Sequence, residues 1–121
     1  QLRVLPLPST SYFGELFEQH VIREIVHRNA SLNLDMQFGY LLTDRDVEID
    51  LVVQRPSLPL CLVEIKSTDR VSEHDASALI QFSQDFPGAQ CLLLSRDPVA
   101  QMIGTVRAVP WRQGIDELTK I

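Results

Sequence analysis

Four charged side chains lie on two neighbouring apolar segments, in a pattern that could bind a divalent cation and act on a phosphodiester. Glu48 and Asp50 lie in the segment EIDLVV, and Glu64 and Lys66 lie in LCLVEIK. Because side chains alternate along a strand, each pair faces one side of its own strand. If the two strands pair through the connection at residues 55–59, all four charges converge on the same side of a sheet.

Each of these residue types suits a definite role in such chemistry. Asp50 and Glu64 supply hard oxygen ligands of the kind that Mg²⁺ takes, while the ion keeps several waters. Lys66 could orient an attacking water or stabilise the negative charge that develops on a phosphoryl group. A carboxylate inside a run as apolar as LCLVEIK costs free energy unless it has a partner or a cation.

A purely structural interpretation of the same residues is an ion pair between Glu64 and Lys66, with Glu48 and Asp50 on an exposed strand edge. We favour the site for three reasons. Lys66 is one of only two lysines in the chain, its strand is apolar on both faces, and an E-x-D segment precedes it at hairpin distance.

A third carboxylate belongs to the same hypothesis. On the helix predicted over residues 13–29, the neighbours of Glu18 three and seven residues later are Val21 and Ile25. Glu18 therefore lies on or beside an apolar face, where it could reach a water bound to a metal ion at the sheet. The alternative is a boundary residue paired with an arginine. Glu15 competes for the role, but the first turn of a helix favours a solvated acid there.

The apolar periodicity predicts the elements that position these residues. A helix is expected over 13–29, capped by Ser11 and stopped at Asn29, and a turn at 43–46 separates the first two strands. A second helix follows Ser72, and a closing helix begins at Pro110. Strands are expected over 34–40, 47–54, 60–67, 91–95 and 106–109, and the later helices over 73–85 and 110–118. This order predicts an α/β domain with a mixed sheet flanked by helices.

Length and composition fit one globular domain over residues 1–121, with 45% hydrophobic and 22% charged residues. The apolar runs are far shorter than a membrane span requires, so we expect no membrane association. Cys61 and Cys91 both lie inside apolar runs and are expected to be buried, reduced thiols of a cytoplasmic protein. The first residue is Gln1, so we expect the chain to be part of a longer polypeptide.

The charge balance limits one class of partner. The formal net charge is −5, with nine arginines and two lysines against 16 acidic residues. Proteins that bind nucleic-acid backbones usually carry a basic patch, because counterion release supplies much of their affinity. We therefore expect only weak nucleic-acid binding by this domain alone. The sequence contains no GxxxxGK[ST] segment, so no P-loop is expected in this chain.

The order and spacing of these segments resemble the PD-(D/E)XK nuclease superfamily. More narrowly, they resemble the C-terminal domain of unknown function of prokaryotic AAA-type P-loop ATPases. The resemblance covers nearly the whole chain. It is carried by SYFGELFE in the first helix, EIDLV, LVEIKS, the helix start at 74–79, and VPW near the end.

The resemblance implies a restriction-endonuclease-like αβββαβ core, Mg²⁺ or Mn²⁺ as cofactor, DNA as substrate, and an N-terminal AAA ATPase domain on the same polypeptide. By position, Glu18 matches the acid of the first helix, Asp50 the strand acid, and Glu64 and Lys66 the E-x-K pair. The residue before Asp50 is Ile49 where the family motif has proline. The alternative function is a non-catalytic regulatory or protein-interaction module of that ATPase.

Overall fold

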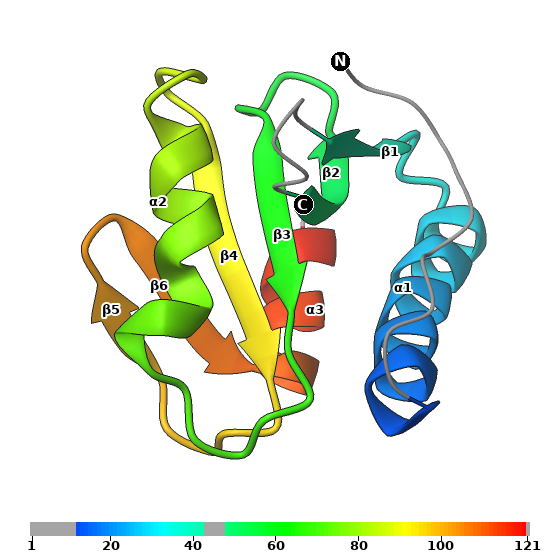
Figure 1. The fold of residues 1–121 in the computed structure, drawn as a ribbon. Helices are drawn as coiled ribbons and strands as arrows, with labels where there is room; N and C mark the ends of the chain where they lie inside the picture. The colour runs from blue at the N-terminus through cyan, green and yellow to red at the C-terminus, as the bar shows by residue number, and fades with distance from the viewer. Residues whose placement is uncertain (1–11, 43–47, 121) are drawn as a thin grey trace.

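The computed structural model describes residues 12–42 and 48–120, which form one mixed sheet flanked by helices (Figure 1). The six strands lie in the order β1-β2-β3-β4-β6-β5. Along the chain the elements are α1 (Tyr12–Leu32), β1 (Gln37–Leu42), β2 (Glu48–Gln54), β3 (Cys61–Ile65), the 3₁₀ helix η1 (Glu73–Ala76), α2 (Ser77–Ser83), β4 (Gln90–Ser95), β5 (Gln101–Ile103), β6 (Val106–Pro110) and α3 (Trp111–Thr119).

The strand directions follow from the lengths of the connections. β1, β2 and β3 pair antiparallel through short links, whereas β3 and β4 are parallel and are joined by the crossover through η1 and α2. β4 is also parallel to β6, and β5 pairs antiparallel with β6 at the sheet edge. The predicted α/β fold with a mixed sheet flanked by helices is confirmed, the two strands that carry the charged pairs are neighbours, and β3 lies in the interior of the sheet.

Both faces of the sheet are covered. α1 and α3 cover one face, where the fully buried Val21 packs with Val63 and Ile115. α2 covers the other face, where Leu79 packs on Leu62, and Figure 1 shows α2 in front of the sheet and α3 behind it. β3 is buried at every position, which explains why its sequence is almost continuously apolar.

The predicted boundary between the first helix and the first strand is wrong. α1 continues past Asn29, whose side-chain oxygen accepts a hydrogen bond from the Met36 N–H instead of ending the helix. The helix ends where Asn33 adopts a left-handed conformation with φ 55°, and Asp35 adopts another with φ 59°. β1 therefore begins at Gln37, later than the predicted residue 34.

Several smaller differences have local causes. The predicted second helix begins as a 3₁₀ turn and ends at Ser83, and β3 is shorter than the predicted strand over 60–67. β5 was not predicted, because three residues are too few to show a period. The proposed Ser11 cap and the turn at 43–46 lie outside the described residues. No helix in the described ranges combines the length and apolar character needed to cross a membrane.

Candidate functional site

The strands β2 and β3 separate at one end of their pairing. Their ladder runs from Val53 opposite Cys61 to Leu51 opposite Val63. The next residue along β2 is Asp50 and the next along β3 is Glu64, and these two carboxylates lie where the strands part. The site is therefore formed by side chains that take the place of regular strand pairing.

A β-bulge in β2 lies at the same point. On β1, Gly39 is opposite Val52 and Leu41 is opposite Ile49, so two β2 residues, Asp50 and its successor, face a single residue of β1. A bulge bends its strand and changes the direction of a side chain. The bulge thus interrupts the regular pairing of β2 with β1 beside Asp50.

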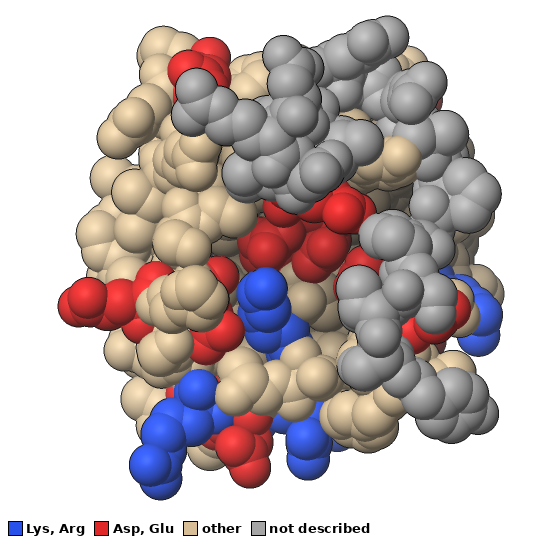
Figure 2. Space-filling view, viewed as in Figure 1, with Lys and Arg blue, Asp and Glu red and all other residues tan. Residues whose placement is uncertain are grey.

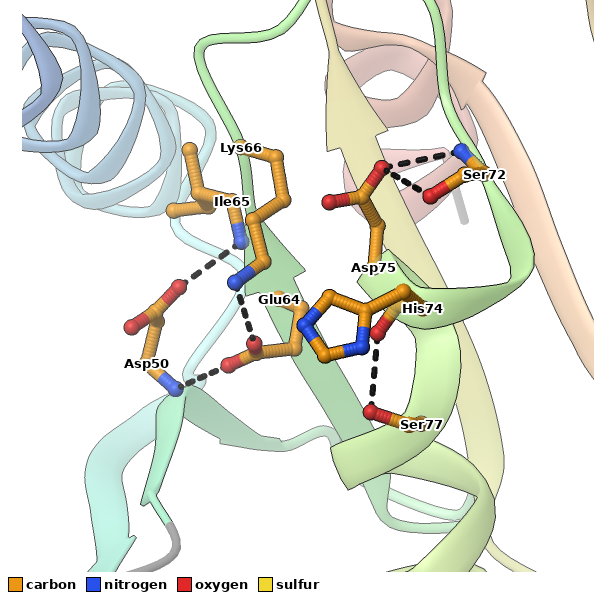
Figure 3. Close-up of polar contacts among 8 residues, drawn as sticks. All are labelled: Asp50, Glu64, Ile65, Lys66, Ser72, His74, Asp75 and Ser77. Carbon is orange, nitrogen blue, oxygen red and sulfur yellow. Dashed lines mark hydrogen bonds and ion pairs between the residues drawn. The ribbon is translucent and has the colours of Figure 1, made fainter.

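Asp50 and Glu64 then bind each other's strands, as Figure 3 shows. The backbone N–H of Asp50 donates to Oε1 of Glu64 at 3.0 Å, and the N–H of Ile65 donates to Oδ2 of Asp50 at 2.8 Å. Nζ of Lys66 lies 3.6 Å from Oε2 of Glu64. The structure thus brings Asp50, Glu64 and Lys66 together, as their spacing predicted.

Glu18 approaches this group from α1. The charges of Asp50, Glu48 and Lys66 all act on it, so it borders the same cluster. Its Oε1 atom is buried and has no hydrogen-bond partner within 12–42 and 48–120. A buried acceptor without a donor is costly, and an unseen water or ion is one of its ordinary explanations. Figure 2 shows acidic side chains gathered at the centre of this face with a basic side chain beside them.

Burial and mutual repulsion make these carboxyls hard to ionise together. Burial raises the pKa of Glu18 to about 8 and that of Glu64 to about 9, and the charge of Asp50 adds to both shifts. Burial also raises the pKa of Asp50, although the hydrogen bond from Ile65 and the charge of Lys66 oppose it. A cation among these groups would remove the repulsion and favour their ionised forms.

The carboxylates of Asp50 and Glu64 suit a divalent cation such as Mg²⁺, which binds oxygen and needs few protein ligands. In the ranges that the structure describes, no group of three or more His, Cys, Asp or Glu side chains is arranged to hold a metal ion. Two carboxylates, Asp50 and Glu64, are nevertheless the number that Mg²⁺ commonly takes, with waters and substrate oxygens completing its shell. The Oε1 atom of Glu18, which has no hydrogen-bond partner among the described residues, fits a further contact to a bound water.

A buried network that the sequence analysis missed supports the loop after Lys66. The carboxylate of Asp97 accepts hydrogen bonds from the N–H groups of Val71 and Val99, which lower its pKa. The N–H of Arg96 donates to the carbonyl of Thr68. The available signal was Asp97 followed by proline, a pair typical of turns in which the Asp side chain binds the backbone two residues later.

Cysteine, histidine and glutamate side chains outside the cluster are buried or contact neighbouring residues. Cys61 and Cys91 are free, buried thiols, as predicted. His20 packs edge-on against Trp111, with ring centroids 5.3 Å apart, and so contributes to the contact between α1 and α3. Glu15 accepts a hydrogen bond from Gln19 one turn later on α1.

Comparison with known proteins finds a solved structure with a similar fold and a family model that matches the sequence. A chain from the structure of Thermococcus gammatolerans McrB AAA+ hexamers with bound McrC has a similar fold, with a TM-score of 0.53 and 16% sequence identity. The similarity covers 80% of the present chain but only 27% of that chain, so the present chain spans about a quarter of its length. None of the curated proteins matches the sequence.

A family model accounts for most of the sequence. It is described as "Domain of unknown function (DUF4143)" and matches residues 13–113, a range that includes α1, the Asp50–Glu64 cluster and the start of α3. The chain belongs to this family of domains of unknown function, DUF4143.

Proposed function

We propose that this chain is a metal-dependent, nuclease-like domain that hydrolyses phosphodiesters at the cluster of Glu18, Asp50, Glu64 and Lys66. The observation that carries the proposal is the meeting of three carboxylates and one lysine where β2 and β3 part. A buried oxygen of Glu18 that has no partner in the part of the chain that the structure describes adds to it. The PD-(D/E)XK resemblance of the sequence points to the same four residues.

Asp50 and Glu64 would hold Mg²⁺ or Mn²⁺ through carboxylate oxygens, and Glu18 would accept a hydrogen bond from a bound water. When bound, the ion would polarise the phosphodiester and lower the pKa of water. Lys66 is 40% exposed at its side chain, so its ammonium reaches both Glu64 and the solvent side of the cluster. From there it would hold the attacking water and stabilise charge that develops on the phosphoryl oxygens.

The test is cleavage of single- and double-stranded DNA by the chain with Mg²⁺ or Mn²⁺. Asp50→Asn is expected to abolish cleavage, because it removes a charged ligand. Lys66→Met is expected to slow the chemical step about 100-fold while metal affinity stays nearly unchanged. Lys120→Met is the matched control, since Lys120 is the other lysine and follows α3, and it should retain full activity. Equal residual cleavage by all variants would identify a contaminant and contradict the proposal.

The second candidate is a non-catalytic interaction module. The specific observation in its favour is that Asp50 and Glu64 already accept backbone hydrogen bonds, which is also how two parting strands can be closed structurally. The net charge of −5 likewise disfavours tight binding to nucleic acid. Absence of cleavage and of divalent-ion binding, with the fold intact, would favour this function.

We also propose that the domain acts together with a P-loop ATPase. The support is a similar fold within a structure that contains AAA+ hexamers, and the sequence resemblance to domains that follow such ATPases. The test is ATP hydrolysis by the polypeptide that contains this chain, with and without residues 1–121. A change in the rate is expected, and identical rates would contradict the coupling.

A further inference from the structure

A second candidate site lies at the opposite end of the sheet from the carboxylate cluster. A pocket of about 440 Å³ opens at the amino ends of the parallel strands β3, β4 and β6 and beside the last turn of α3. Its volume falls within the range of small-molecule sites. It is lined by Arg55, Gln90, Thr105, Arg107 and Glu117, with Cys61 and Leu118 among its apolar walls.

One of the two arginines is already neutralised. Arg107 donates to both carboxylate oxygens of Glu117, from Nε and from a terminal nitrogen, at 2.8 Å each. Gln113 donates to the same carboxylate at 3.0 Å. These hydrogen bonds lower the pKa of Glu117 to about 2, so the carboxylate stays ionised and bound to Arg107. Glu117 is therefore not available to balance a second arginine.

Arg55 is the second arginine of the pocket, and Glu117 does not neutralise it. Its guanidinium donates from one terminal nitrogen to the neutral side chain of Gln90, and no acidic partner pairs with it within 12–42 and 48–120. Its Nε–H is buried and has no hydrogen-bond acceptor in the same ranges. An unsatisfied buried donor on a charged group is costly, and a water or ion that the structure does not contain is an ordinary explanation.

We propose that this pocket binds a small anionic molecule, with a phosphate or carboxylate group held by Arg55. The hydrogen bond to Gln90 fixes the guanidinium at the pocket wall, and the planar fork suits a two-oxygen anion. Thr105 lines the same pocket and offers a hydroxyl to the rest of the ligand. The site shares no residue with the carboxylate cluster, so it stands independently of the proposed hydrolysis.

The test measures binding of sodium phosphate and of sodium succinate by calorimetry, at an ionic strength matched with sodium chloride. Saturable binding of at least one anion is expected for the wild-type chain. Arg55→Met, which keeps an apolar stem but no charge, should weaken it about tenfold or more. Arg112→Met is the matched control, because Arg112 stacks on Trp111 outside this pocket, and it should bind as the wild type does.

Two further measurements keep the test decisive. The Nε–H resonance of Arg55, assigned by its loss in Arg55→Met, should move on titration with the bound anion. Arg55→Lys keeps the positive charge and serves if Arg55→Met does not fold; it should still bind several-fold more weakly, because it lacks the planar fork. Asp50→Asn should bind the anion unchanged.

Three results would overturn the proposal. The first is equal affinity of the wild type and the Arg55 variants. The second is the absence of saturable binding of either anion. The third is Arg55-dependent binding of a single-stranded oligonucleotide without binding of phosphate or succinate, which would assign the pocket to a nucleic-acid backbone instead.

Discussion

Asp50 and Glu64 are joined by a reciprocal arrangement in which each carboxylate accepts a backbone N–H from the other's strand. The N–H of Asp50 binds Glu64 at 3.0 Å, and the carboxylate of Asp50 binds the N–H of Ile65, the residue after Glu64, at 2.8 Å. Beyond Leu51 and Val63, hydrogen bonds from backbone N–H groups to these carboxylates thus take the place of backbone-to-backbone hydrogen bonds between β2 and β3. The result is a pair of acidic groups held rigidly at the point where two central strands diverge.

Replacing Glu64 separates its role as a hydrogen-bond acceptor from its role as a charge. Glu64→Gln keeps an oxygen for the N–H of Asp50 and stays neutral at every pH, so the free energy of unfolding of the metal-free chain should not fall. Glu64→Ala leaves that N–H without its acceptor and should lower the free energy of unfolding by about 1–3 kcal/mol. Guanidinium denaturation in the presence of a chelator measures both. Equal destabilisation by the two variants would contradict this account of the pair.

The stability of the metal-free chain should decrease as the pH rises from about 5 to 9. Glu18 and Glu64 have pKa values raised to about 8 and about 9, so the folded state binds more protons than the unfolded state throughout this window. Stability is therefore present below the ordinary carboxyl pKa and is lost as the pH passes through the raised values. The charges around them belong to Glu48, Asp50 and Lys66.

The measurement is the Tm of wild type and Glu64→Gln across this pH range in chelator. The wild-type Tm should fall by several degrees as the pH rises, and that of Glu64→Gln should fall less. Parallel curves for the two proteins would show that Glu64 does not titrate in this window.

Gly114 is required by the close packing of α3 on β4. A Cβ at this position would lie 2.0 Å from Cδ2 of Leu94 and 3.0 Å from Cγ2 of Val109. Gly114→Ala should therefore lower the free energy of unfolding by about 1–3 kcal/mol, even though alanine favours helices. Lys120→Ala, at the exposed C-terminal cap of the same helix, is the control and should change it by less than about 0.5 kcal/mol. A stabilised Gly114→Ala variant would refute the packing.

Cys61 and Cys91 should be unreactive in the folded chain. Both are buried, and burial raises the pKa of Cys61 to about 12, so almost no thiolate forms at neutral pH. Mass spectrometry after iodoacetamide treatment should detect no labelling in native buffer and two labels in guanidinium. Rapid native labelling would show that the β3–β4 region opens easily.

Sequence patterns predicted the arrangement of this fold better than its boundaries. The apolar run of β3 and its short link to β2 were enough to predict that these two strands pair antiparallel and that β3 is central. The end of α1 could not be predicted, because Asn29 binds Met36 across the turn and Asn33 sets the end by its left-handed conformation. Neither the hydrogen bond nor the left-handed conformation produces a periodic pattern in the sequence.

Only part of the candidate site could be predicted, because local sequence patterns indicate some of its residues and contacts distant in sequence determine the rest. E-x-D and E-x-K on adjacent strands were sufficient to bring Asp50, Glu64 and Lys66 together. The bulge beside Asp50 depends on the register with β1, and the support from Asp97 depends on contacts distant in sequence. The pocket at Arg55 combines residues from seven separate elements or links, so no local motif indicates it.

Calorimetric titration with Mn²⁺ tests the central claim most directly, because it asks whether the carboxylate cluster holds a divalent ion without requiring a substrate. The account predicts one saturable Mn²⁺ site in the wild type and in Lys66→Met, and its loss in Asp50→Asn and Glu64→Gln at unchanged fold. Absence of Mn²⁺ binding by the wild type, or equal binding by Asp50→Asn, would contradict it.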